Sequence, residues 1–180
     1  MKEKYKGFLE RLMFKIEVGA DLISELLVPD KKISYYIGEL SLPKLANRIK
    51  YPYKKPLIDV EKKIGVEPRA EEMKKRTEEY KKEQREIVEN FNSIDDLSKI
   101  KKNLLDWRSE LKDYSSELKK EIERKHKEEL IYNIYRFEYY LDAHAGTILR
   151  NINEITHLMK VDEFMEQMKK REEESRIMFV

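Results

Sequence analysis

The sequence predicts an all-α protein, a helical bundle with a long antiparallel coiled-coil hairpin. All five prolines lie between Pro29 and Pro68, and none follows. Because proline lacks a backbone N–H and its ring clashes with the preceding turn, a region without proline is free to form long helices. That region holds one glycine, Gly146, and the whole chain is 41% charged and 40% hydrophobic. Such a composition is typical of helical, coiled-coil-rich proteins.

The first helix is expected over residues 3–28. Apolar side chains recur there every three or four residues, from Tyr5 to Leu26, and therefore share one face. Gly19 falls on that face, where the missing side chain allows a neighbouring helix to approach closely. Pro29 ends the helix, because the residue before a proline avoids the α region.

Residues 29–68 are expected to form short helices joined by turns. The candidates cover residues 33–40, 42–49 and 56–64, and Gly65 is placed to cap the last of them at its C-terminus. This segment carries nine Lys or Arg against five Asp or Glu, so it is the basic part of a chain whose net charge is +2.

Residues 69–129 are expected to form a charged hairpin arm. A helix over residues 69–91 has only a narrow apolar stripe, which favours one strand of a coiled coil. Ser93 and Asp96 are spaced as a capping box for the next helix, so the chain is expected to fold back after Asn92. The alternative is one very long helix from about Ile94 to Arg171, with dimerisation supplying the missing surface.

Residues 130–180 return to the body. From Leu130 to Met159 the sequence is rich in apolar and aromatic residues at helical spacing, which makes this stretch the expected core partner of the first helix. The domain organisation is therefore a helical body, residues 1–68 and 130–180, and a coiled-coil arm, residues 69–129.

Composition also bounds the function. The chain has no cysteine, which excludes disulfides, thiolate metal sites and cysteine nucleophiles. It has no long apolar run, so we expect no membrane span, no signal peptide and a cytoplasmic location. The few glutamines and the abundance of Lys, Glu and Ile are typical of thermophiles. Neither a cofactor nor a metal is expected.

A basic segment suggests contact with nucleic acid. Between Glu39 and Asp59 there are five bases and no acid, with two tyrosines among them. Bases neutralise phosphates and tyrosines stack on unpaired bases, although a solvated loop gives the same pattern. The candidate nucleic-acid-binding residues are Lys44, Arg48, Lys50, Tyr51, Tyr53, Lys54 and Lys55.

Arg150, Asn151 and His157 carry the one enzymatic hypothesis. An arginine followed by a polar residue, with a histidine after six intervening residues, resembles the motif of the HEPN-family ribonucleases, which are also all-helical. The resemblance implies that Arg150 contacts phosphate and that His157 serves proton transfer, in a metal-independent cleavage across a dimer. The alternative is a surface arginine and a flanking histidine.

Three weaker patterns complete the survey. Two Glu-x-x-His pairs, Glu123/His126 and Glu154/His157, are too close in sequence for a di-metal bundle. Asp95 and Asp96 lie at the expected hairpin tip, where they either cap the helix or act on a larger machine. Residues Ile177, Met178, Phe179 and Val180 are apolar after a charged run, which indicates docking on the body or on a partner.

The expected function is that of a non-enzymatic helical interaction or scaffold protein. It would bind a protein partner or form a homodimer, and the 44–55 segment would add nucleic-acid contact. The alternatives are a HEPN-like ribonuclease and a small regulator that inserts its coiled-coil arm into a larger machine.

Overall fold

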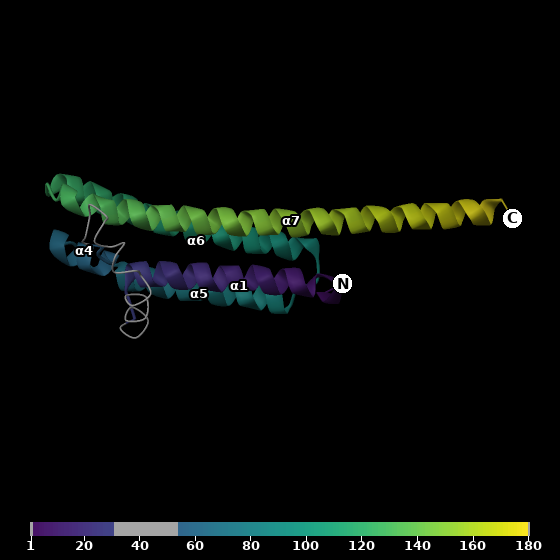
Figure 1. Ribbon diagram of the computed structural model, residues 1–180, viewed down its shortest axis with the longest axis horizontal. Helices are drawn as coiled ribbons and strands as arrows, with labels where there is room; N and C mark the ends of the chain where they lie inside the picture. Colours follow the sequence, from purple (N-terminus) through teal and green to yellow (C-terminus); the bar gives the residue numbers. More distant parts are fainter. Residues whose placement is uncertain (1, 31–53, 180) are drawn as a thin grey trace, which may run out of the picture.

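The all-α prediction is confirmed. The computed structural model describes residues 2–30 and 54–179, and no strand occurs among them. The predicted short helices between residues 33 and 49 lie outside these ranges. Four long helices and two short ones make up the described fold (Figure 1): α1 (Lys2–Leu27), α4 (Leu57–Ile64), α5 (Ala70–Glu89), α6 (Ile94–Arg124), the 3₁₀ turn η1 (Glu128–Leu130) and α7 (Ile131–Met178).

The four long helices form one closed bundle. They run alternately in opposite directions, and the contacts join α1 to α5, α5 to α6, α6 to α7 and α7 back to α1 (Figure 1). The stripe of α5 that looked too narrow for a core helix is buried between α1 and α6. The α5–α6 hairpin is therefore half of the bundle and not an arm that projects from a separate body.

Ion pairs between neighbouring helices explain how so charged a hairpin packs into a bundle. Arg85 lies 2.6 Å from Glu17 of α1, and Lys81 lies 2.7 Å from Asp21 of the same helix. Each pair is worth little by itself at a solvated surface. The long aliphatic stems of Lys81 and Arg85 can lie along the edges of the apolar core, so a charged helix still contributes a buried face.

An aromatic and polar layer crosses the middle of the bundle. The rings of Tyr80 and Trp107 stack with centroids 4.2 Å apart, and the indole Nε1 of Trp107 donates to Thr77 Oγ1 at 3.0 Å. The ring of His144 stands edge-on to both aromatic rings and fills the space beside Gly19. A methyl group on Gly19 would lie 1.8 Å from Nδ1 of His144, so the glycine is required for this packing.

The two turns between the long helices differ in how visible they are in the sequence. Ser93 and Asp96 form the expected capping box, and the Asp96 carboxylate accepts from the backbone N–H of Asn92 at 2.7 Å. The α6–α7 turn depends instead on His126, whose φ of 55° places it in the left-handed region that usually requires glycine. Because α6 ends at Arg124 and α7 begins at Ile131, the alternative of one continuous helix from Ile94 to Arg171 is wrong.

Helix α7 outlasts the bundle. It has 48 residues, roughly 72 Å at 1.5 Å per residue, and its C-terminal part extends beyond the ends of the other helices (Figure 1). Met159 is its last buried residue, and every residue from Glu163 to Phe179 is exposed. We call residues 160–179 the projection. Within the described ranges, no helix is long and apolar enough to cross a membrane.

Candidate functional site

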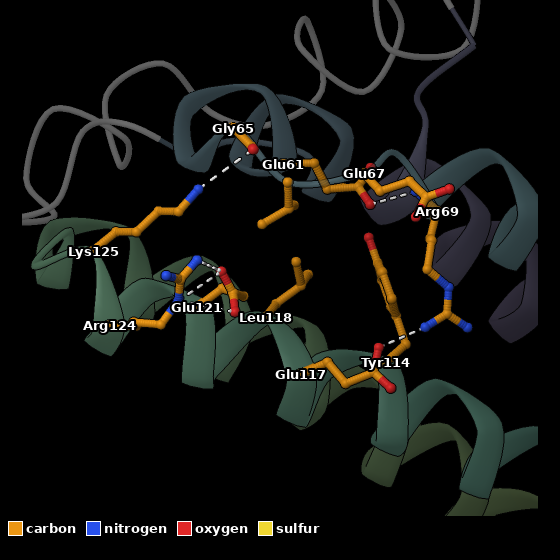
Figure 2. Close-up of a pocket in the computed structure, with 11 residues that line it drawn as sticks. Glu61, Gly65, Glu67, Arg69, Tyr114, Glu117, Leu118, Glu121, Arg124 and Lys125 are labelled. Carbon is orange, nitrogen blue, oxygen red and sulfur yellow. Dashed lines mark hydrogen bonds and ion pairs between the residues drawn. The ribbon is translucent and has the colours of Figure 1, made fainter.

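The best-defined hollow lies where α4, the start of α5 and the end of α6 meet. It has a volume of about 470 Å³, and its lining is largely charged (Figure 2). Glu61 and Arg69 line it from the side of α4 and α5, while Tyr114, Glu117 and Arg124 line it from α6. The chemistry of this hollow depends on whether its charged groups are free to bind a ligand.

The carboxylate of Glu61 forms hydrogen bonds with the backbone at the start of α5. Its side chain is 1% exposed, and its carboxylate accepts from the backbone N–H groups of Arg69 at 2.7 Å and Ala70 at 3.1 Å. These are two of the N–H groups that a helix leaves unpaired at its N-terminus, where the helix dipole also favours an acid. Glu61 lies in α4. This helix ends at Gly65, which has a φ of 76° and is the C-cap, as predicted.

Most of the other charged groups around the hollow also pair with the protein. Arg69 pairs with Glu117 at 2.5 Å, and Arg124 pairs with Glu121 at 2.8 Å. Lys125 donates to the Ile64 carbonyl at 2.6 Å. The Tyr114 hydroxyl points toward Glu61 (Figure 2), and burial together with that carboxylate raises its pKa. These contacts hold α4 and the start of α5 against α6, and they leave few charged groups free to bind a ligand.

The buried histidine is a structural group of the core. Burial lowers the pKa of His144 to about 4, so the imidazole is neutral at physiological pH. Its Nε2 lies 3.4 Å from the hydroxyl of Tyr80, which is itself buried. The neutral ring is only 8% exposed and packs edge-on against Tyr80 and Trp107, which makes it part of the core.

The residues of the ribonuclease hypothesis lie on the outer surface of α7. Arg150 and His157 are both exposed. Asn151 is half-buried and turned toward α1, where its Oδ1 accepts from Lys15 Nζ at 3.1 Å. The hypothesis of metal-independent cleavage stays a prediction.

Most of the predicted nucleic-acid segment lies outside the described residues. This holds for Lys44, Arg48, Lys50, Tyr51 and Tyr53. Of the remaining two, Lys54 is exposed and Lys55 is half-buried, with its backbone N–H donating to Asn133 Oδ1 at 2.8 Å. Contact with nucleic acid through this segment also stays a prediction.

The two aspartates at the hairpin tip lie in the first turn of α6. Asp96 is buried and caps α6, and the backbone N–H groups of Asn92 and Ser93, that of Asn92 above all, lower its pKa although burial acts to raise it. Asp95 is exposed in the first turn of the same helix. Among the described residues, no group of three or more His, Asp or Glu is placed to hold a metal ion.

The projection exposes several large apolar side chains, in addition to those, such as Phe14 and Tyr139, that the bundle exposes. Ile177, Met178 and Phe179, expected as partner-binding residues, are strongly exposed, with Phe179 at 90%, while Val180 lies outside the described residues. Sequence reasoning missed four more exposed side chains nearer the bundle: Val161, Phe164, Met165 and Met168. Val161, Met165 and Met168 are spaced four and three residues apart on the side of α7 away from Met159, and this spacing was the signal that could have revealed them.

The base of the projection is anchored to α1. The Tyr5 hydroxyl donates to the Asp162 carboxylate, and Lys4 Nζ lies 2.9 Å from the same group. These contacts lower the pKa of Asp162, mainly through the hydrogen bond from Tyr5. Two side chains from the first turns of α1 thus fix the direction in which α7 leaves the bundle.

The comparisons with known proteins leave function to be argued from this geometry. No protein-family model matches the chain, and neither curated proteins nor solved structures show a significant similarity to it.

Proposed function

We propose that the protein is a non-enzymatic helical interaction protein that binds a protein partner through its projection. The bundle is the rigid base of this design, and residues 160–179 are the binding element. The observation that carries the proposal is the exposure of large apolar side chains along one free helix, with Phe164 59% exposed and Phe179 90% exposed. A helix in water gains nothing by presenting such side chains unless another surface covers them.

The spacing of these side chains indicates the kind of surface that covers them. Val161, Met165 and Met168 recur at intervals of four and three residues, which is the seam of a coiled coil. Phe164 lies one residue from Met165 and widens the seam at its centre. A seam of this width fits one partner helix or the groove between two helices.

The rest of the molecule supports this use of the projection. The projection continues the helix of the bundle. The unfavourable nucleation of a first helical turn is therefore not required, and the free segment only has to extend an existing helix. Tyr5 and Lys4 hold its base through Asp162. The hypothesis of a regulator that inserts an arm would accordingly use the projection, because the α5–α6 hairpin packs within the bundle.

Photo-cross-linking from defined positions tests the proposal. A photoreactive residue replaces Phe164 on the seam in one variant and Lys170, on the opposite side of the same helix, in a matched control. In extract of the source cells, we expect discrete cross-linked species from position 164 and few from position 170. Equal patterns from both positions, or no product from either, would contradict binding through the seam.

A further inference from the structure

The projection has an ordered arrangement of side-chain types. Four exposed apolar residues lie among acids in 161–168, three bases follow at 169–171, three acids at 172–174, and apolar residues return at 177–179. Within the part of the chain that the structure describes, no charged side chain from Glu163 to Arg176 takes part in an ion pair. In the bundle, by contrast, ion pairs join each helix to its neighbours. The charges of the projection are therefore available to a binding partner.

This order is complementary to itself when it is read in the opposite direction. Two antiparallel copies that cross between Arg171 and Glu172 place the basic block of each copy against the acidic block of the other. The same alignment places Phe164 and Met165 beside Met178 and Phe179 of the second copy. A parallel, in-register pair would instead set each base against its twin and each acid against its twin, which is unfavourable.

The seam passes through the centre of this alignment. Continued at 3.5 residues per step from Val161, it passes Met168, reaches Arg171 and Glu172 together, and then Ser175. At the crossing point, Arg171 of one copy faces Glu172 of the other, and the reciprocal pair lies beside it. Charged residues at such a position fix register and orientation, while the apolar ends supply most of the affinity.

We propose that the partner of the projection is a second copy of this chain, bound antiparallel along residues 164–179 with the crossing point between Arg171 and Glu172. This inference rests on the proposed function, because it identifies the partner for the same surface. The overlap of residues 164–179 is roughly 24 Å long for its 16 residues. Since the copies run in opposite directions, their two bundles lie at opposite ends of the pair and do not collide.

Charge reversal in the full-length chain tests the inference by sedimentation equilibrium. Arg171→Glu sets two acidic pairs at the crossing point, and Glu172→Arg sets two basic pairs, so each change is expected to weaken the dimer about tenfold. The double variant R171E/E172R restores two opposite-charge pairs and is expected to recover the wild-type dissociation constant. Lys170→Glu, the same reversal one residue away from the seam, is the matched control and should have a smaller effect.

The outcomes separate this inference from the proposed function. A dimer that each single reversal weakens and the double variant restores, with a scattering profile of two bundles at opposite ends, supports the antiparallel pair. A monomer at all concentrations overturns it, as does a dimer that the reversals leave unchanged, since that is expected of a parallel pair. If position 164 then cross-links to a different protein, the proposed function stands and the second copy is the wrong partner. If position 164 yields no product at all, both fail.

Discussion

The two halves of α7 belong to one continuous helix but differ in almost every respect. Residues 131–159 bury an apolar face against α1 and α6, with Ile148 fully covered. Residues 160–178 have nearly every side chain in solvent, and Val161, Met165 and Met168 share a face on the side of the helix away from the buried stripe. The comparison teaches that apolar periodicity specifies a helix and a face, whereas burial depends on whether a neighbouring helix packs against that face. Here α1 begins at Lys2, beside Asp162, and the cover ends there.

The strongest test of the covered half removes the space that Gly19 provides. We expect Gly19→Ala to destabilise the protein by about 3 kcal/mol, because the new methyl group meets the His144 ring at 1.8 Å and that ring is held against Trp107. Urea unfolding measures the change. In the double variant G19A/H144A the clash is gone, so its stability should equal that of His144→Ala alone. Additive losses from the two substitutions would contradict the packing described here.

The sequence predicted part of this layer and missed the rest for a physical reason. Gly19 was expected to allow close approach because it interrupts an apolar face, and that prediction is confirmed. That His144 would fill the gap was not predictable, since residues so far apart in sequence are brought together only by the topology of the bundle. The hairpin of α5 and α6 was misjudged for a related reason. Its many charged residues indicated a helix surrounded by solvent, but Lys81 and Arg85 form ion pairs with α1.

The limits of the candidate site follow the same logic. The sequence identified the apolar residues 177–179 because a charged run precedes them, and Met159 as the last residue of the rich apolar stretch. It did not reveal that α7 continues alone, because Val161, Phe164 and Met165 look like core residues until the neighbouring helices are seen to end. The turn at His126 was equally hidden, because a histidine occupies a backbone position that normally signals itself through glycine.

Acid provides a second test that affects the covered half of α7. The pKa of His144 is held at about 4 in the folded protein, against an ordinary value near 6.5 in the unfolded chain. Below pH 6.5 the unfolded chain gains a proton that the folded protein cannot accept, so the stability due to the neutral ring is complete above pH 6.5 and is lost between pH 6.5 and 4. We expect a loss of about 2 kcal/mol between pH 7.5 and pH 5.

The control for this pH dependence is His144→Gln, which removes the titrating ring and keeps a polar side chain. Its unfolding free energy should change less over the same interval, because the acids with lowered pKa, such as Asp96 and Asp142, lose their contribution at lower pH. Identical pH profiles for the wild type and His144→Gln would show that the histidine is not buried as a neutral ring.

The smallest expected effect tests the exposed half of α7 directly. Met165→Ala and Met168→Ala remove most of two large side chains, yet each is expected to change the free energy of unfolding by less than about 0.5 kcal/mol, because both residues are already in solvent. Ile148→Val, which removes one methyl group from the covered half, should cost about 1 kcal/mol. Urea unfolding at low protein concentration, where self-association is absent, measures all three. A larger loss from either methionine than from Ile148→Val would mean that the bundle itself covers the projection, and the apolar seam would then stabilise the fold and have no role in binding.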